Sequence, residues 1–157
     1  MKLHSKPGRL ARGIAIFAIL WATPLYAQLE VGTWVRTPTK AVPDSMTMKI
    51  EVCCGGGRRL TYSMAAGKQV ILMSLETKLD GSEAAVIIDG KPSGETMAIT
   101  RVDAHHANTI IRMNGKEFAT STATLSADGK TLSVVNDCGS TAGCMPLGKS
   151  TETWVKQ

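Results

Sequence analysis

The chain has 157 residues, with 18 lysines and arginines against 13 acidic residues and a formal net charge of +5. Four of the bases lie in the first 12 residues, where there is no acid, so the remainder is nearly neutral. With only 4% aromatic residues and no basic stripe, the composition excludes a typical nucleic-acid-binding surface.

Residues 1–27 have the three-part form of a secretory signal. A basic segment precedes the apolar run 13–21, and Pro24 leads to a small-residue end at Ala27. The run is shorter than the roughly 20 residues of a membrane-spanning helix, which disfavours the alternative of a retained anchor. We therefore expect cleavage after Ala27, an exported protein that is periplasmic or secreted, and no membrane span in the mature chain.

Residues 28–157 are predicted to form one domain, since roughly 130 residues lie within the usual size range. Their apolar residues recur with a period of two, and turn residues separate the runs at the spacing of all-β proteins. The expected strands are 31–36, 46–53, 59–64, 70–75, 84–88, 96–101, 109–113, 117–125, 131–136 and 150–156. Asn-Gly and Asp-Gly pairs mark tight hairpins at 89–90, 114–115 and 128–129, and glycines mark a turn at 55–57.

Consecutive hairpins predict an all-β, antiparallel up-and-down meander of about eight to ten strands. Closure into a barrel would remove its two exposed edges. Within 117–125, Phe118 and the threonines share one face, while Ala119, Ser121, Ala123 and Leu125 share the other. Small residues on both faces favour a curved sheet.

Three residues carry a resemblance to a known group of proteins. Gly32 and Trp34 form a G-x-W opening of the first strand, and Trp154 lies in the last strand. With the Asn-Gly-Lys and Asp-Gly-Lys hairpins, this series resembles small secreted bacterial proteins of lipocalin-like or fatty-acid-binding-protein-like (calycin-type) form, mostly of unassigned activity. The resemblance implies a barrel in which Gly32, Trp34 and Trp154 take part in closure. The chain departs from those families in having no arginine after Arg112 and no room for lid helices in 37–45.

Four cysteines follow the signal segment and suit an oxidising compartment. Cys138 and Cys144 lie in one glycine-rich loop and can reach disulfide distance, so we favour this pairing over a long-range one. Cys53 and Cys54 are adjacent, and adjacent side chains of a strand face opposite ways. They form either a vicinal disulfide or redox-responsive pair, or free or intermolecular thiols, and the second interpretation is favoured. No metal site or cofactor is expected, because the cysteines and histidines lack ligand spacing.

His105 and His106 lie in a polar turn with Asp103, where no nucleophile–base arrangement is indicated. Methionines are the candidates for ligand contact, because flexible thioethers adapt to apolar ligands, although they can equally fill a core. The six candidates are Met46, Met48, Met64, Met73, Met97 and Met113.

The expected function is non-enzymatic binding of a small apolar molecule inside the barrel. The alternative is an envelope protein-interaction module, such as an inhibitor or assembly factor, acting through end loops at 139–148 and at Arg58 and Arg59. An enzyme is the least favoured class.

Overall fold

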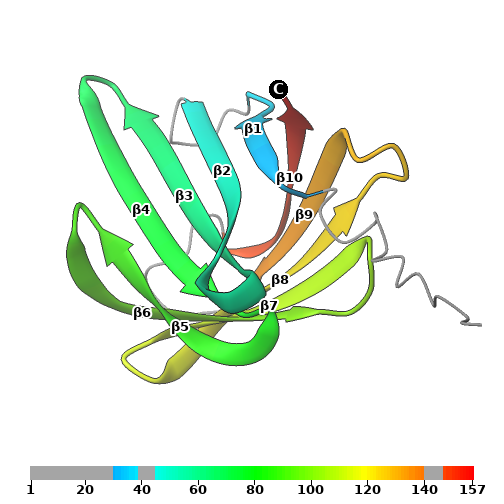
Figure 1. Cartoon of the computed structure of the whole chain (residues 1–157). Helices are drawn as coiled ribbons and strands as arrows, with labels where there is room; N and C mark the ends of the chain where they lie inside the picture. The colour runs from blue at the N-terminus through cyan, green and yellow to red at the C-terminus, as the bar shows by residue number, and fades with distance from the viewer. Residues whose placement is uncertain (1–29, 39–44, 140–146) are drawn as a thin grey trace, which may run out of the picture.

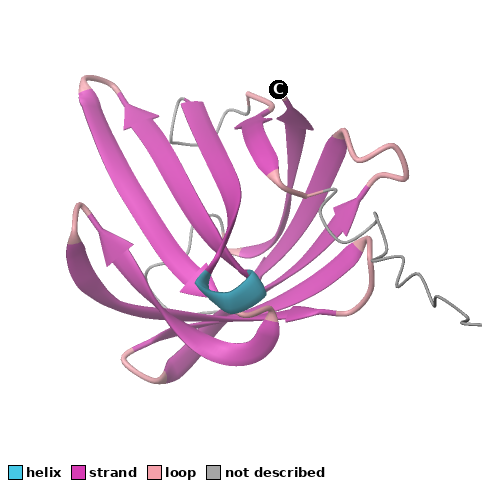
Figure 2. Cartoon of the chain, in the orientation of Figure 1, coloured by secondary structure: helices cyan, strands magenta, loops and turns pink. Residues whose placement is uncertain are grey.

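The protein is a ten-stranded antiparallel β-barrel, seen here in a computed structural model that describes residues 30–38, 45–139 and 147–157 (Figure 1). The strands are β1 Gly32–Arg36, β2 Ser45–Cys53, β3 Gly57–Ala66, β4 Gln69–Thr77, β5 Asp80–Ile88, β6 Lys91–Arg101, β7 His106–Met113, β8 Lys116–Leu125, β9 Thr131–Cys138 and β10 Gly148–Lys156. A short 3-10 turn, η2 Cys54–Gly56, joins β2 to β3 and is the helix drawn in Figure 2. The all-β prediction is confirmed, and the predicted signal segment lies outside the described residues.

Each strand pairs with its neighbours in sequence, and β1 pairs with β10 to close the barrel. In that closing ladder Val35 faces Val155 and Arg36 faces Trp154. The predicted up-and-down order and the pairing of the first and last strands are therefore both confirmed.

The turns lie at two rims of the barrel. The N-terminal rim holds residue 30, the last residues of β10 and the turns after β2, β4, β6 and β8. The hairpin rim holds the turns after β3, β5 and β7, which gather on the left of Figure 1. Asp89 and Asn114 adopt positive φ beside Gly90 and Gly115, as the Asp-Gly and Asn-Gly hairpins predict.

Period-two alternation places one face of every strand in the interior. In β2, Met48 and Ile50 are buried while Thr47 and Lys49 are exposed. In β8 the face that carries Ala119, Ser121, Ala123 and Leu125 points inward, and Leu125 belongs to the core. Buried core residues are Trp34, Met48, Ile50, Leu60, Leu75, Ala84, Ile99, Leu125, Leu132 and Trp154.

The register pairing of neighbouring strands is sparsest between β4 and β5. These strands share two register pairs, Met73 with Ile88 and Ser74 with Ile87, whereas β3 and β4 pair all the way from Arg58–Thr77 to Ala66–Gln69. The register of β5 against β6 also shifts at two places, as it does at a β-bulge. The barrel therefore has one seam that few backbone hydrogen bonds hold.

The described residues contain no helix of the length and apolar character that a membrane crossing requires.

Candidate functional site

An apolar cavity of about 270 Å³ lies inside the barrel. Four of the six candidate methionines line it: Met46 and Met48 of β2, Met73 of β4 and Met97 of β6. The cavity extends from the level of Met46 and Ile111 to the exposed β6–β7 turn at the N-terminal rim. The structure thus brings most of the predicted thioethers to the surface of one cavity.

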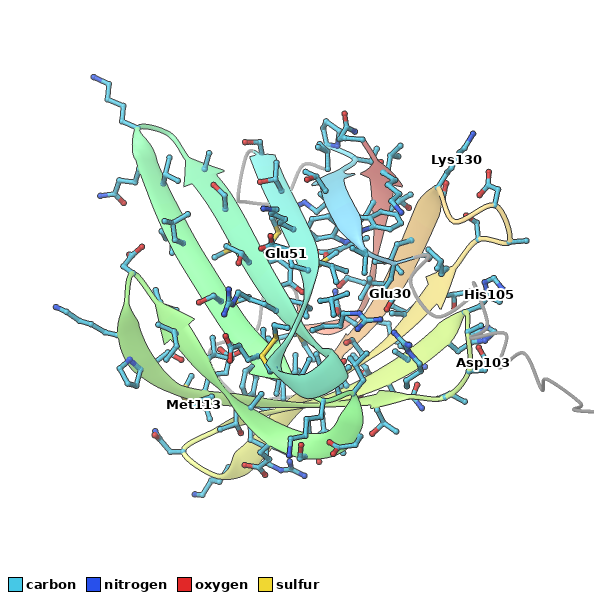
Figure 3. All side chains as sticks on the ribbon, viewed as in Figure 1. Glu30, Glu51, Asp103, His105, Met113 and Lys130 are labelled. Carbon is cyan, nitrogen blue, oxygen red and sulfur yellow. A yellow bond between two sulfur atoms is a disulfide. The ribbon has the colours of Figure 1, made fainter. Side chains whose placement is uncertain are left out.

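Met64 and Met113 are not among the residues that line this cavity. Met64 is one inward position closer to the hairpin rim than Tyr62, which does line it. Met113 follows a register irregularity at Ile111 and Arg112 and is 39% exposed. Figure 3 shows Met113 far across the view from Glu30 at the N-terminal rim. Period-two alternation predicts which face of its strand each of these two residues occupies, but not how far along the barrel axis it lies.

Small side chains of β7 and β8 create the space. Ala107 and Thr109 of β7 and Ser121 and Ala123 of β8 line the cavity where larger residues would fill it. An eight-stranded barrel interior is just wide enough to be filled by side chains or to hold one small ligand. Because this barrel has ten strands and small residues on one wall, its interior has room for a small ligand.

The predicted barrel-closing residues lie at the β1–β10 junction. Trp34 is fully buried beneath Lys156, whose Nζ lies 5.6 Å from the centre of the indole ring. Gly32 has φ +142°, and a Cβ there would lie 2.7 Å from Cε of Lys156. The G-x-W opening has a glycine here because the backbone is in the positive-φ region, whereas the flexible end of Lys156 can move away from a Cβ.

Trp154 lies in the cavity wall and packs edge-on against Tyr62, with ring centroids 6.1 Å apart. The resemblance implied a part in barrel closure for this tryptophan, which pairs with Arg36 in the β1–β10 ladder and belongs to the core cluster. Its Nε1 is buried and has no hydrogen-bond acceptor within the described part of the chain. Trp154 therefore contributes packing to the wall, while its Nε1 is out of reach of the cavity.

A partly buried ion pair lies on the inner face of the closing strands. Arg36 of β1 donates from its Nη1 to Oε1 of Glu152 in β10 at 3.2 Å, and the arginine side chain is 5% exposed. Burial, and then the negative charge of Glu152, raise the pKa of Tyr62 far above its ordinary value. The cavity wall thus keeps the phenol of Tyr62 neutral.

A second charged group crosses the N-terminal rim. Oε1 of Glu30 accepts from Nε of Arg58 at 2.9 Å and also from Nη2 of Arg101, while the Glu30 carbonyl accepts from Nε1 of Trp34 at 2.8 Å. All three charged side chains line the cavity. Glu30 therefore fixes the segment that precedes β1 across this rim (Figure 3).

Sequence reasoning missed this rim cluster and placed Arg58 in an exposed end loop, which is wrong. The Arg58 residue is 5% exposed and also donates to the carbonyls of Gly56 and Gly57 at 3.0 Å each. The sequence does contain a signal for the inward position of Arg58, because period-two alternation puts it on the same face as Leu60 and Tyr62. Arg36 could have been found in the same way, since it shares a face with Trp34.

The two histidines of the β6–β7 turn both make contacts that hold the turn. Oδ1 of Asp103 accepts from the backbone nitrogens of His105 at 2.7 Å and His106 at 2.8 Å. The hydrogen bond from the His105 backbone, followed by that from the His106 ring, lowers the pKa of Asp103. Nδ1 of His105 lies 3.1 Å from the carbonyl oxygen of Leu125. The turn also forms the exposed boundary of the cavity.

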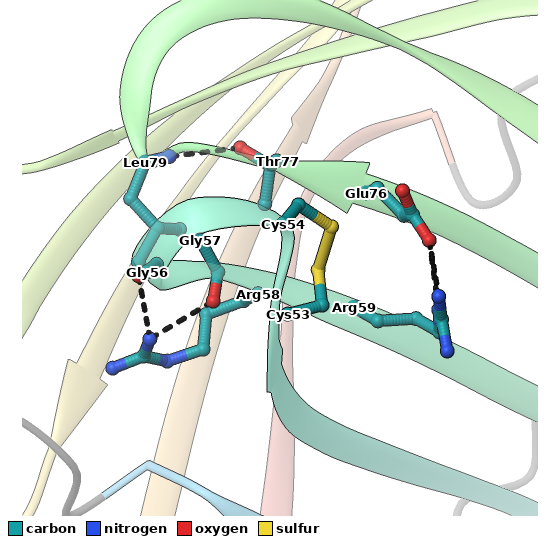
Figure 4. Close-up of a disulfide and its surroundings, with 9 residues drawn as sticks. All are labelled: Cys53, Cys54, Gly56, Gly57, Arg58, Arg59, Glu76, Thr77 and Leu79. Carbon is teal, nitrogen blue, oxygen red and sulfur yellow. Dashed lines mark hydrogen bonds and ion pairs between the residues drawn. A yellow bond between two sulfur atoms is a disulfide. The ribbon is translucent and has the colours of Figure 1, made fainter.

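Cys53 and Cys54 are joined in a vicinal disulfide, which is the interpretation that the sequence favoured less. The rule that adjacent strand residues face apart fails here because β2 ends at Cys53. Cys54, Gly55 and Gly56 all have positive φ and turn the chain sharply toward β3. Figure 4 shows the bridge on the side of Arg59 and Glu76, with Arg58 pointing the other way.

Cys138, at the end of β9, is also disulfide-bonded. The predicted partner, Cys144, lies outside the described residues, so the Cys138–Cys144 pairing stays a prediction. Cys138 and the Cys53–Cys54 pair lie at opposite rims of the barrel, which follows from the strand order.

No protein-family model and no curated protein sequence matches the chain.

Proposed function

We propose that this protein is an exported, calycin-type barrel that binds a small apolar molecule in its interior. The observation that carries the proposal is the cavity of about 270 Å³, which methionine, leucine and isoleucine side chains line from several strands. Its volume lies just below the roughly 300–1,000 Å³ of pockets that hold drug-sized ligands, which favours a smaller molecule. Thioethers suit such a site because they adapt to apolar ligands of different shape.

The charge of Glu152 in the cavity wall bears on the kind of ligand. Its pairing with Arg36 already balances the carboxylate, which favours a neutral ligand at that level. A small, neutral and mainly apolar molecule fits this wall.

The role we propose is not catalytic. The ring nitrogens of His105 and His106 contact a backbone carbonyl and the Asp103 carboxylate, which stabilises a turn. A hydrolase screen of the purified protein tests this, and turnover that His105→Ala or His106→Ala abolished would reverse it.

The alternative of an envelope interaction module gains no support from the described loops. Arg58 is turned inward, and most of 139–148 lies outside the described residues. A stoichiometric partner from envelope extract that deletion of 140–146 released would favour this alternative.

Titration with phenylnaphthylamine, a neutral apolar fluorescent probe, tests the ligand site. We expect saturable binding by the wild-type protein and at least a roughly tenfold weaker affinity in Ala123→Phe, because the ring fills the cavity and about 1.4 kcal/mol of lost binding energy is tenfold. The matched control is Thr122→Phe, which adds a ring on the exposed outer face of the same strand. Equal affinity in the two variants, or no binding by the wild type, would reject the proposal.

A further inference from the structure

The turn that carries the vicinal disulfide also brings a carboxylate to the two sulfur atoms. The Sγ atoms of Cys53 and Cys54 and a carboxylate oxygen of Glu76 all lie within 4.8 Å of one another. Cys54 and Glu76 are exposed, and Cys53 is half-buried, so the group lies on the outer surface of the barrel. It is separate from the cavity, which Glu76 and the two cysteines do not line.

We propose that the reduced form of this turn is a binding site for one soft divalent cation, such as Zn²⁺ or Cd²⁺, with Cys53, Cys54 and Glu76 as ligands. Thiolates and carboxylates are both ligands of Zn²⁺, and thiolates select soft metals. Three protein ligands leave the fourth tetrahedral position for water. The disulfide form offers no thiolate, so binding requires reduction.

The redox step is a two-electron exchange with a dithiol reductant. The Cys53–Cys54 sulfur–sulfur bond breaks as the dithiol closes its own disulfide, and the two cysteine sulfurs take up its two protons. Cation binding then displaces both thiol protons and forms two metal–sulfur bonds. The reverse step, oxidation of the pair, releases the cation.

Contacts other than the disulfide hold the turn in place. Nη1 of Arg58 donates to the carbonyl oxygens of Gly56 and Gly57 from the inner side (Figure 4). Gly57 lies so close to β4 that a Cβ would be 2.5 Å from the carbonyl oxygen of Thr77. These contacts do not involve sulfur, so we expect the two thiols to stay beside Glu76 after reduction.

Arg59 positions the third ligand. Its Nε and Nη2 donate to Oε1 of Glu76 at 2.9 and 2.5 Å, which fixes the position of the carboxylate. Partners of this kind, one shell beyond the metal, are a regular part of protein metal sites. Two thiolates and one carboxylate beside one guanidinium sum to two negative charges, which balances a divalent cation.

The test is a Cd²⁺ titration of the full chain, reduced with a phosphine under anaerobic conditions and followed by the ultraviolet thiolate-to-cadmium absorption band. We expect one Cd²⁺ per chain in the reduced protein and none in the oxidised protein. Because reduction also opens the bridge of Cys138, the binding must persist in a Cys138→Ser/Cys144→Ser variant and vanish in Cys53→Ser/Cys54→Ser.

The decisive comparison leaves all cysteines in place. Glu76→Gln is expected to weaken Cd²⁺ binding at least about tenfold, since even an outer-shell partner contributes about 10–100-fold. Glu51→Gln is the matched control, because Glu51 is a neighbouring outer-face carboxylate, paired with Lys49 and not part of the ligand group. Circular dichroism checks that both variants are folded. Equal affinities in these two variants, or Cd²⁺ bound without Cys53 and Cys54, would overturn the proposal.

Discussion

At the scale of one residue, the phenol of Tyr62 makes the stability of the protein depend on pH. Its phenol lines the cavity, packs against Trp154 and has a pKa raised first by burial and then by Glu152. In the unfolded chain the group ionises near the ordinary value of 10.0. The native state therefore holds a proton that the unfolded state releases at alkaline pH.

This difference predicts an alkaline loss of stability that depends on Tyr62. A raised native pKa gives a stabilising contribution that is complete below pH 10.0 and is lost as the pH rises toward the native pKa. One proton corresponds to a slope of about 1.4 kcal/mol per pH unit in that range. We expect urea midpoints of the wild type to fall more steeply above about pH 10 than those of Tyr62→Phe. Parallel pH profiles for the two proteins would contradict the assignment.

At the scale of the element, two turns use glycine for different reasons. Gly115 ends the β7–β8 hairpin with φ +79°, and a Cβ there would meet open space. Gly57 begins β3 with an ordinary φ of −72°, but a Cβ there would contact the Thr77 carbonyl. The first glycine meets a backbone requirement and the second a steric one.

The two requirements predict different responses to substitution. Gly115→Ala should cost about 1–2 kcal/mol, and Gly115→Asn should recover part of it because asparagine tolerates positive φ. Gly57→Ala should cost about 1–3 kcal/mol by overpacking, and Gly57→Asn should be no better. Urea unfolding of the four variants measures this, and a recovery by asparagine at Gly57 would show that its backbone, not the contact with β4, is limiting.

At the scale of the whole molecule, closure and the β4–β5 seam make the wall uneven. The β1–β10 ladder closes the sheet with pairs such as Val35–Val155, so neither terminal strand is a free edge. The seam between β4 and β5, in contrast, has two register pairs. Local unfolding begins in regions with few backbone hydrogen bonds, while core strands open only when the whole protein unfolds.

Native-state hydrogen exchange should resolve this difference. We expect amides of the β9–β10 and β3–β4 ladders to exchange only by global unfolding, and amides on the facing edges of β4 and β5 to exchange by local opening with a smaller free energy. Uniform protection around the barrel would show that side-chain packing compensates for the sparse pairing at the seam.

The sequence predicted the strands, their order and the closure, because alternation and turn dipeptides are local signals. Strand ends were set too short, as in β6, which begins at Lys91 rather than at 96. The cluster of Glu30 with Arg58 and Arg101 depends on register across distant strands, which no local pattern encodes. The vicinal disulfide was disfavoured because the strand rule was applied to Cys54, which the positive-φ turn removes from the strand. The cavity depends on summed side-chain volumes, so it could be proposed only from the methionines.

The even number of strands has a practical consequence. Glu30 and Gln157 both leave the barrel at the rim that the cavity reaches, where Gln157 donates to the carbonyl of Thr33. An affinity tag or surface tether fused after Gln157 would lie at this rim and obstruct the entry of a ligand. Dyes and immobilisation chemistry are better attached on the far side, at the solvent-exposed bends of Lys68 or Lys116.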